Sequence, residues 1–323
     1  MKVEELALQR KRYAHLSDEE WRWMLQQAEG RQRTCDKLPT FAKIEDWWYP
    51  ARLSCEQCSS EITARYKASL LPKTPFTLTD LTGGYGVDTF FMSEHATQAH
   101  YVERNENLCS VAAHNFALLG LGHIEIINGN SEEVLPALPS CDWIFLDPAR
   151  RDGAGKKVVA LADCEPDVAA LRQQLLQKAR RVMVKCSPML DITAACRQLG
   201  CVAEVHTVAV NNECKELLFI LTDDATDVPR VCCVNIVNGS AQTFTFSMND
   251  TPEAGYAAEV GAFLYEPNAA IQKAGCHPSL ATSYAVQKLH RNSNLYTSDA
   301  LAAQFPGRIF KVTGVAGFSK NEL

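Results

Sequence analysis

The first part of the chain, residues 1–72, has the spacing of apolar residues that is typical of helices. Ser17 precedes three acidic residues, and a serine with acids behind it is a common helix start. Trp21 and two apolar residues three and four positions later would form one buried helix face. A further helix is expected from about Cys58 to a point before Pro72. We therefore predict an N-terminal helical domain.

Between residues 73 and 222, short apolar runs alternate with segments of helical periodicity. Such alternation is typical of a parallel sheet covered by its connecting helices. The last two strands differ, because only a short link that begins with Asn211-Asn212 joins them, and so short a link permits only an antiparallel pair. The expected strands cover residues 76–81, 100–103, 123–128 and 142–146, then a fifth strand around Arg180 to Lys185, and finally residues 201–210 and 216–222. The expected helices cover residues 108–119, 168–178 and 192–199.

The composition changes after the last of these strands. Two further strands, residues 231–238 and 243–248, flank Asn238-Gly239-Ser240, a turn sequence that hairpins favour. A helix is expected near residues 267–273, and short strands alternate with loops towards the end of the chain. Phe318-Ser319-Lys320 looks like the start of another helix, so we expect the chain to be truncated and its last domain to be incomplete.

The segment over residues 76–105 holds the most informative motif. Its first strand carries Asp80 near the end, the glycine turn Thr82-Gly83-Gly84-Tyr85-Gly86 follows, and a second strand ends on Glu103. Glycines let the backbone take positive φ angles and let a ligand approach it closely. An acid at the tip of the second strand, about 20 residues on, can accept hydrogen bonds from ribose hydroxyls. The pattern predicts an adenosine cofactor site, and a glycine turn without a ligand is the alternative.

The choice of cofactor follows from what the turn lacks. Gly84 and Gly86 fit a pyrophosphate-binding G-x-G-x-x-G fingerprint, but Thr89 stands where its third glycine belongs. Asp88 places a negative charge where phosphate needs N–H groups, and the sequence contains no G-x-x-x-x-G-K-[ST] P-loop. S-adenosylmethionine carries an ammonium and a sulfonium but no phosphate, and Asp80 at the strand end suits those positive groups. We predict S-adenosylmethionine as the cofactor, and not NAD.

Motifs along the whole chain add up to a family resemblance. The strand over residues 142–146 runs into Asp147-Pro148-Ala149-Arg150, and Gly129-Asn130-Ser131 follows the third strand. Together with DLTGGYGVD and VERN, these resemble the cofactor and active-site motifs of class I S-adenosylmethionine-dependent methyltransferases. More narrowly, QCSSEITARYK, DPARRD, KCSPMLD, LYEPNAAIQKAG, KLHRNSNLYTSD and FPGRIF resemble bacterial methyltransferase-like proteins with a C-terminal THUMP-like domain. The resemblance covers nearly the whole chain.

The resemblance implies an α/β fold with a Rossmann-like, seven-stranded methyltransferase sheet, an N-terminal helical domain and a small α+β C-terminal region. The implied domains are a helical domain over 1–72, the cofactor-binding domain over 73–222, a ferredoxin-like domain over 223–280 and a truncated THUMP-like domain over 281–323. The implied cofactor-binding residues are Asp80, Thr82, Gly83, Gly84, Gly86, Asp88, Glu103, Asn130 and Ser131. The implied catalytic residues are Asp147, Pro148, Arg150 and Lys185.

Two catalytic schemes remain open. In methyltransferases that act on exocyclic amines, an acid or amide after the fourth strand accepts hydrogen bonds from the amine and an aromatic ring stacks on the base. Here Asp147 is present but the aromatic is missing, so Arg150 is expected to stack on a base or to pair with a phosphate. The turn also resembles the DPPR of RNA uracil-C5 methyltransferases, whose nucleophilic cysteine follows the fifth strand. Cys186 stands at that place with Lys185 beside it to favour the thiolate, and a core cysteine is the alternative.

Composition sets the class of protein. With 323 residues, 46% of them hydrophobic, the chain is long enough for two or three globular domains. It has no apolar run of about 20 residues and no apolar core near its N-terminus, so neither a membrane span nor a signal peptide is expected. An odd number of cysteines, 13, favours reduced thiols in the cytoplasm.

Charge and metal-binding patterns narrow the expected function further. The net charge of −6 argues against a wholly electrostatic nucleic-acid binder. No H-E-x-x-H pattern occurs, and the Cys55–Cys58 pair has no partner pair, so no metal is expected. Basic residues nevertheless gather after the fourth strand and around the fifth, where solvated loop charges are the alternative for Lys156 and Lys157. They are Arg150, Arg151, Lys156, Lys157, Arg180, Arg181 and Lys185.

Three functions therefore compete. Because THUMP-like units present RNA to a catalytic domain, the resemblance favours methylation of a base in structured RNA, either tRNA or rRNA. A methyltransferase for a small molecule or protein and a non-catalytic RNA-binding protein that keeps the cofactor fold are the alternatives. The N-terminal helices and the C-terminal units are expected to form the substrate platform, with residues 57–67 near the active-site mouth. That segment contains the polar Ser59, Ser60, Arg65 and Lys67, for which an exposed helix face is the alternative.

Overall fold

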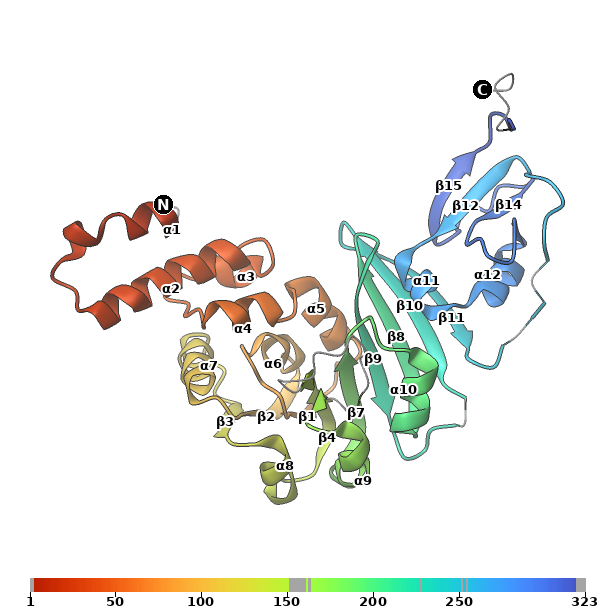
Figure 1. The fold of residues 1–323 in the computed structure, drawn as a ribbon. Helices are drawn as coiled ribbons and strands as arrows, with labels where there is room; N and C mark the ends of the chain where they lie inside the picture. Colours follow the sequence, from red (N-terminus) through yellow and green to blue (C-terminus); the bar gives the residue numbers. More distant parts are fainter. Residues whose placement is uncertain are drawn as a thin grey trace. The chain divides into compact units, whose positions relative to one another are not determined.

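The computed structural model describes residues 3–150, 161, 164–226, 228–250, 252–253 and 255–317, and of Arg150 only the main chain. These residues form two compact units. The first contains residues 3–150 and 164–183, and the second contains residues 161 and 184–317. Figure 1 shows the elements of both units in chain order. The basic residues Arg151, Lys156 and Lys157 and the expected helix start at Phe318 lie outside the described residues.

The first unit begins with helices, as the apolar pattern predicted. They are α1 (Val3–Ala7), the 3-10 helix η1 (Arg10–Tyr13), α2 (Asp18–Thr34), α3 (Pro39–Ala42), α4 (Arg52–Gln57) and α5 (Glu61–Ser69). The predicted start of α2 is confirmed. The Ser17 hydroxyl accepts a hydrogen bond from the Glu20 N–H at 3.2 Å, and the Glu20 carboxylate accepts one from the Ser17 N–H at 2.7 Å. This reciprocal pair satisfies two N–H groups at the start of the helix.

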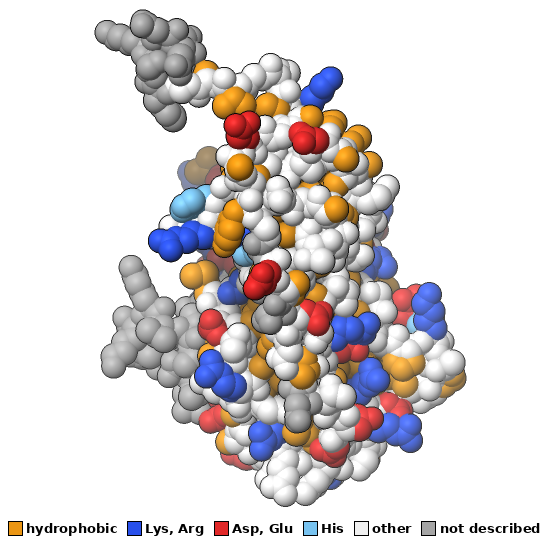
Figure 2. Space-filling view, turned by 90° about the vertical axis from the view of Figure 1, so that its right-hand side faces the viewer, with side chains coloured by type: hydrophobic (Ala, Val, Ile, Leu, Met, Phe, Trp, Pro, Cys, Tyr) orange, Lys and Arg blue, Asp and Glu red, His pale blue; other side chains and the backbone are white. Residues whose placement is uncertain are grey.

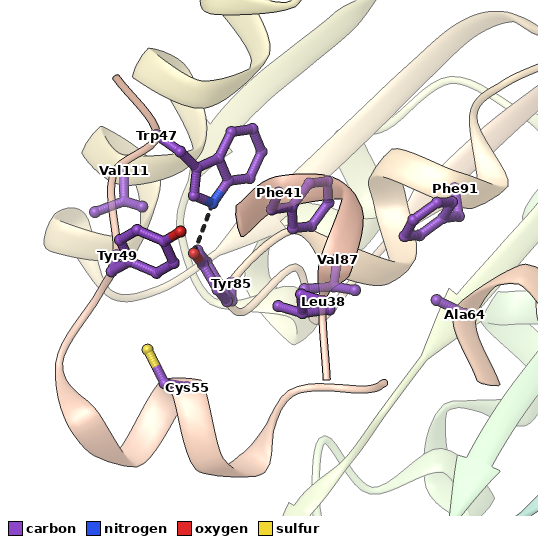
Figure 3. Close-up of a cluster of buried hydrophobic side chains, with 10 residues drawn as sticks. All are labelled: Leu38, Phe41, Trp47, Tyr49, Cys55, Ala64, Tyr85, Val87, Phe91 and Val111. Carbon is purple, nitrogen blue, oxygen red and sulfur yellow. Dashed lines mark hydrogen bonds between the residues drawn. The ribbon is translucent and has the colours of Figure 1, made fainter. Parts of the chain in front are cut away.

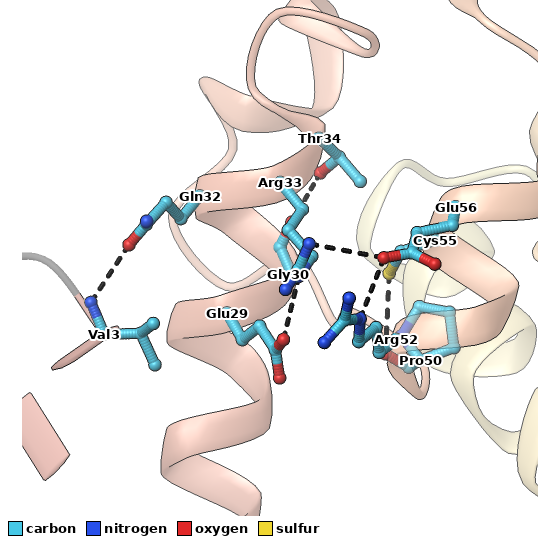
Figure 4. A network of polar contacts seen from close by, with 10 residues as sticks. All are labelled: Val3, Glu29, Gly30, Gln32, Arg33, Thr34, Pro50, Arg52, Cys55 and Glu56. Atoms are coloured by element: carbon cyan, nitrogen blue, oxygen red, sulfur yellow. Dashed lines mark hydrogen bonds and ion pairs between the residues drawn. The ribbon is translucent and has the colours of Figure 1, made fainter.

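Charged side chains join α2 to α4 at the surface. Arg33 contacts Glu29, one turn earlier, at 2.8 Å and Glu56 of α4 at 3.2 Å (Figure 4). Arg52 contacts the same oxygen of Glu56 at 2.8 Å. Because water screens such exposed pairs, they orient the two helices more than they stabilise them.

The strands that form the large sheet in the first unit are parallel, as their alternation with helices predicted. β1 (Phe76–Asp80) pairs with β2 (Ala96–Glu103) and β4 (Cys141–Leu146), and β2 pairs with β3 (Ile124–Asn128). The helices between and after them are α6 (Val87–Met92), α7 (Glu106–Leu118), α8 (Ser131–Val134), the 3-10 helix η2 (Leu135–Ala137) and α9 (Val168–Lys178). A short ribbon of β5 (Ala149–Arg150) and β6 (Cys164–Glu165) follows β4. Since parallel strands end at one edge of the sheet, this edge is where an open α/β sheet binds a ligand.

The N-terminal helices and the strand domain share one hydrophobic core. Phe41 stacks on Trp47, with ring centroids 4.2 Å apart, and lies 5.8 Å from Phe91 of α6. The Trp47 indole donates a hydrogen bond to the Tyr85 hydroxyl at 2.7 Å. The N-terminal helices thus complete the core of the strand domain. Its buried members include Leu38, Phe41, Trp47 and Tyr49 from the N-terminal segment and Tyr85, Val87, Phe91 and Val111 from the strand domain (Figure 3).

The second unit contains two hairpins. β8 (Val202–Val210) and β9 (Glu213–Leu221) are antiparallel, which confirms the prediction from their short link. β10 (Arg230–Val237) and β11 (Ser240–Ser247) form the second hairpin, and β10 runs parallel to β8. The turn residues Asn211, Asn212, Asn238 and Gly239 have φ angles of 49°, 63°, 49° and 77°. Asn and Gly tolerate such positive angles, which match the twist of the strands in a tight hairpin.

The large sheet has nine strands, not the expected seven. Its order is β11-β10-β8-β9-β7-β4-β1-β2-β3, and β7 (Ala179–Cys186) runs through the boundary of the two units. The other seven are those of the expected Rossmann-like sheet, which is confirmed. The sequence had placed β10 and β11 in a separate small domain after residue 222. They join the large sheet because the outer edge of β8 offers main-chain N–H and C=O groups, and β10 forms hydrogen bonds with these groups.

The end of the described chain forms a small antiparallel sheet with the order β13-β14-β12-β15. Its strands are β12 (Phe263–Pro267), β13 (Gln287–Lys288), β14 (Tyr296–Ser298) and β15 (Gly307–Lys311). The remaining helices of this unit are α10 (Ile192–Leu199), α11 (Ala269–Ala274) and α12 (His277–Tyr284), and α11 packs on β8 and β10. Within the described ranges, every helix is too short or too polar to cross a bilayer.

Candidate active site

A cavity of about 500 Å³ lies in the first unit, at the carboxyl ends of the parallel strands. Its wall includes Thr82 and Gly84 after β1, Glu103 at the end of β2, Ser131 after β3 and Asp147 after β4. A volume of this size is ordinary for a pocket that binds a cofactor or a small ligand. Four of the strands therefore bring residues that are far apart in the sequence to one place.

The glycine turn contributes Thr82, Gly84 and Tyr85 to the cavity wall, whereas Gly83 and Gly86 lie behind it. Gly84 has a φ of 55° and Gly86 a φ of 82°, both in the left-handed region that favours glycine. Gly83 packs against Tyr101, and a Cβ atom at this glycine would lie 2.2 Å from the ring. The Tyr101 hydroxyl donates a hydrogen bond to the Gly84 carbonyl at 2.5 Å. The turn is thus fixed by its own backbone and by a buried ring, and the main chain of Gly84 faces the cavity.

Glu103 is one of the charged residues of the cavity wall. One carboxylate oxygen accepts a hydrogen bond from the Gly84 N–H at 2.9 Å, and the other accepts one from the Asn105 N–H at 2.8 Å. Each carboxylate oxygen has two lone pairs, so each can accept one more hydrogen bond from a ligand. The two backbone contacts hold the carboxylate in a fixed orientation, which suits it to receive a pair of neighbouring hydroxyls.

Hydrogen bonds also fix the loops after β1, β3 and β4. The Thr82 hydroxyl accepts from the Asp147 N–H at 2.6 Å, and the Ser131 hydroxyl donates to the Leu81 carbonyl at 2.5 Å. Asn130 caps α8, because its side-chain oxygen accepts from the N–H two residues on at 2.9 Å. Both Asn130 and Ser131 line the cavity.

Asp80 does not line the cavity but lies buried beneath the glycine turn. Its two oxygens accept hydrogen bonds from the Thr82 N–H at 3.0 Å and from the Thr89 hydroxyl at 2.5 Å. Burial raises the pKa of this carboxyl to about 7, although both hydrogen bonds act in the opposite direction. In this structure Asp80 therefore ties the turn to α6, and its expected contact with the positive groups of the cofactor stays a prediction.

Asp88 is also turned away from the cavity. It forms a salt bridge of 3.2 Å with Lys67 of α5, whose side chain is fully buried. The Ser59 hydroxyl donates to the other Asp88 oxygen at 2.7 Å and accepts from Lys67 at 3.2 Å. Arg65 on the same helix pairs with Glu61 at 2.8 Å. The polar side chains of this segment thus hold α5 against the start of α6, which is why the segment is more polar than its helical pattern requires.

The expected catalytic residues are distributed over both units. Asp147 lines the cavity and Pro148, beside it, is half-buried. The main chain of Arg150 belongs to β5 and pairs with Cys164 of β6. Lys185 and Cys186 lie at the end of β7 in the second unit, and both are half-buried.

The cavity wall includes residues that the motifs did not indicate. Leu53, Ser54, Gln57 and Cys58 of α4 and its end contribute one side of the wall. Gln57 and Cys58 belong to the segment that was expected near the mouth, so this expectation is confirmed for its first two residues. Leu53 and Gln57 are one helical turn apart, so they share one face of α4. This spacing is visible in the sequence, but the sequence does not show that this face lies opposite the strand ends and closes the cavity.

A second unforeseen part of the wall comes from the β5–β6 ribbon. Glu165 of β6 lines the cavity and forms a salt bridge of 3.1 Å with Arg104, which follows Glu103. Both side chains are partly exposed, and the pair joins the ribbon to the end of β2 across the cavity wall. No linear motif links residues this far apart in the sequence.

Comparisons with known proteins bear on the fold and the family of the chain. The chain is 34% identical to a protein of Porphyromonas gingivalis W83 that is provisionally assigned as a methyltransferase, over 95% of this chain and 77% of that one, with a TM-score of 0.88. A family model described as a ferredoxin-like domain matches residues 263–306, a range that crosses the expected domain boundary at residue 280. No curated protein sequence matches the chain.

Two further solved structures are too dissimilar to carry an argument. One is yhhF of Escherichia coli, provisionally a methyltransferase, with 17% identity over 51% of this chain and 84% of that one and a TM-score of 0.36. The other is SMU.776, provisionally a methyltransferase and crystallised with S-adenosylhomocysteine, with 12% identity over 50% of each chain and a TM-score of 0.40. The P. gingivalis protein is similar in both sequence and fold over almost the whole chain. This chain therefore belongs to the same family, the class I S-adenosylmethionine-dependent methyltransferases that carry a C-terminal ferredoxin-like domain.

Proposed function

We propose that the protein binds S-adenosylmethionine in the cavity of the first unit and transfers its methyl group to a base in structured RNA. The observation that carries the cofactor proposal is the Glu103 carboxylate. Its two oxygens are oriented by the N–H groups of Gly84 and Asn105 and keep lone pairs for a ribose diol. Family membership supports the same cofactor.

The other residues of the wall fit the remaining parts of this cofactor. Asn130 and Ser131, half-buried after β3, would contact the adenine, and the main chain of Gly84 would lie along the ligand. None of these contacts requires a phosphate-binding group. When bound, the cofactor supplies an electrophilic methyl group on a positively charged sulfur.

Asp147 is the residue we assign to catalysis. Its main chain is held by the Thr82 hydroxyl, so the carboxylate has a fixed starting point at the cavity wall. There it would accept a hydrogen bond or a proton from the substrate atom that receives the methyl group. Pro148 would stiffen the turn, and Arg150 and Lys185 would supply positive charge for the base or phosphate of the substrate.

Family architecture and surface charge bear on the substrate. The C-terminal ferredoxin-like domain suggests a unit that presents a large substrate to the catalytic domain, an argument by analogy of fold. On the face seen in Figure 2, Lys and Arg side chains are scattered among acidic ones and do not gather into a single basic patch. Local contacts rather than overall charge would then select the RNA. A small molecule or a protein is the alternative substrate.

Calorimetry on Glu103→Ala tests the cofactor proposal. The change removes a charge-assisted ribose contact, so affinity for S-adenosylhomocysteine should fall by on the order of 2 kcal/mol, or about 30-fold. Glu106→Ala is the matched control, because Glu106 is an exposed acid of α7 outside the cavity wall. Binding of NAD by the wild type, with no response to S-adenosylhomocysteine, would refute the assignment.

A labelling experiment tests the reaction and its substrate. The protein is incubated with methyl-labelled S-adenosylmethionine and, separately, with total bacterial RNA, protein or small metabolites. Label in the RNA fraction that Asp147→Ala abolishes and Cys186→Ala leaves intact would support the proposal. The reverse result would indicate the covalent cysteine mechanism. Label in another fraction would support the alternative substrates, and no label in any fraction would favour a non-catalytic binding protein.

A further inference from the structure

A cluster of three different metal-ligating side chains lies in the second unit, on β8 and β10. Glu204 and His206 alternate along β8, so both point to the same face of the sheet. In the parallel pairing, Cys232 of β10 lies directly beside His206 and Arg230 lies beside Glu204. Among the described residues, the ligand atoms of Glu204, His206 and Cys232 all lie within 4.8 Å of one another.

We propose that Glu204, His206 and Cys232 form a binding site for a zinc ion or a similar transition metal. Imidazole nitrogen, thiolate sulfur and carboxylate oxygen are the ligands that Zn²⁺ prefers. Three protein ligands leave one position of a tetrahedral site for water or an external ligand. The proposed site lies outside the cofactor cavity and is independent of the methyltransferase proposal.

The distances in the cluster suit such an ion. Bonds of about 2.0–2.1 Å in a tetrahedral site place neighbouring N and O ligand atoms about 3.3 Å apart. The His206 Nε2 atom and the Glu204 Oε2 atom are 3.2 Å apart. The Cys232 sulfur lies within 4.8 Å of the other two ligand atoms, so with Zn–S bonds of about 2.3 Å it would have to approach them by at most about 1.2 Å. A rotation of its half-buried side chain provides a movement of that size.

The surroundings of the cluster also suit a metal. Arg230 contacts the Glu204 Oε1 atom at 3.0 Å, which orients the carboxylate and leaves Oε2 directed at the histidine. Metal ligands are commonly held by such outer partners. His206 is buried, whereas the Glu204 side chain is 23% exposed, so an ion can enter from the solvent side. The Thr245 hydroxyl of β11 donates a hydrogen bond to the Cys232 sulfur at 3.7 Å and so helps to position it.

Charge balance supports the same conclusion. A divalent ion bound by one carboxylate, one thiolate and a neutral imidazole gives a site with no net charge. A simple charge cluster of Arg230, Glu204 and His206 is the competing interpretation. It needs no contribution from Cys232, and this difference can be tested.

Cobalt(II) titration of the purified full chain distinguishes the two. Cobalt is a spectroscopic substitute for zinc, and a tetrahedral cobalt site with a thiolate ligand shows intense visible bands and a near-ultraviolet charge-transfer band. We expect these bands to saturate at about one ion per chain and to disappear when zinc is added. An absence of the charge-transfer band, or visible bands as weak as those of aqueous cobalt, would overturn the proposal.

Variants assign the ligands. Cys232→Ser should abolish the charge-transfer band and weaken zinc binding, measured by chelator competition, by more than the ~10–100-fold that loss of an outer partner costs. Cys201→Ser is the matched control, because Cys201 is an exposed thiol just before the same strand β8, and it should leave binding unchanged. A charge-transfer band that persists in Cys232→Ser would refute the assignment.

Two further variants keep the test decisive if Cys232→Ser does not fold, as judged by circular dichroism. Glu204→Gln is nearly isosteric and should weaken zinc binding by more than the ~10–100-fold that loss of an outer partner costs. Arg230→Gln, at a position 59% exposed, should weaken it by about 10–100-fold as an outer partner. Wild-type zinc affinity in either variant would contradict the proposed site.

Discussion

The buried ion pair between Lys67 and Asp88 makes a quantitative prediction for Lys67→Met. The Lys67 side chain is fully buried and that of Asp88 is 10% exposed, so water cannot replace either partner. After the substitution, Asp88 would keep the Ser59 hydroxyl as its donor but would lose its counter-charge. Removing one member of a buried pair costs about 3–5 kcal/mol, because the other charge stays buried without compensation. That is a large part of the 5–15 kcal/mol by which typical domains are stable.

The removal of both charges should cost much less than the removal of one. In Lys67→Met/Asp88→Asn no uncompensated charge remains, and well-packed replacements of buried pairs are often nearly neutral. The double-mutant cycle should therefore show a coupling of several kcal/mol between the two positions, compared with about 0.2–1 kcal/mol for an exposed pair. Arg65→Met is the matched control on the same helix, since Arg65 is 54% exposed, and it should cost less than about 1 kcal/mol.

Urea unfolding provides the measurement. All five tryptophans, Trp47 of the shared core among them, lie in the first unit, so tryptophan fluorescence reports on that unit. Circular dichroism at the same urea concentrations shows whether the transition follows a two-state course. If Lys67→Met costs no more than Arg65→Met, or if the effects of the two single substitutions simply add, then the burial argument is wrong.

Two other predictions concern the glycine turn and the acid buried beneath it. Burial raises the pKa of Asp80 from about 3.9 in the unfolded chain to about 7, so the folded state holds an extra proton between these values. The stability contributed by Asp80 should be complete below about pH 4 and should be lost as the pH rises through 7, by up to ~1.4 kcal/mol per pH unit. Urea unfolding of the wild type from pH 5 to 8 should include this fall in the free energy of unfolding, and Asp80→Asn should show a smaller fall. Parallel profiles of the two proteins would contradict the prediction. Gly83→Ala should destabilise the fold by about 1–3 kcal/mol in the same assay, because its Cβ atom would overlap the buried Tyr101 ring. Gly122→Ala is the control and should be neutral, because its Cβ atom would have no atom within 4 Å. Equal effects of the two substitutions would show that the turn relaxes.

Local patterns predicted the parts of the fold that depend on neighbouring residues. The cap at Ser17 and the turn at Asn211 and Asn212 involve residues a few positions apart, and both were predictable. The edge to which a hairpin attaches depends on distant strands. The turn at Asn238 therefore predicted the β10–β11 hairpin but not its place beside β8 in the large sheet.

The same division applies to the candidate site. The position of Glu103 at the end of β2 could be predicted, because strand alternation and the distance from the glycine turn fix it. The surroundings of Asp80 and Asp88 could not, since an acid near a glycine turn looks the same in sequence whether it faces a ligand or a buried lysine. Only tertiary packing brings Lys67 to Asp88 and Thr89 to Asp80. Whether these acids also influence the bound cofactor stays a prediction.

The shared core of the first unit limits how the protein can be divided. A fragment that began at residue 73 would contain every strand of the cofactor region, yet it would leave Tyr85, Val87 and Phe91 facing water. It would also lack the wall that α4 gives to the cavity and the counter-charge of Asp88. The N-terminal helices are therefore not a removable attachment, and a search for the smallest active piece has to start from a chain that keeps them.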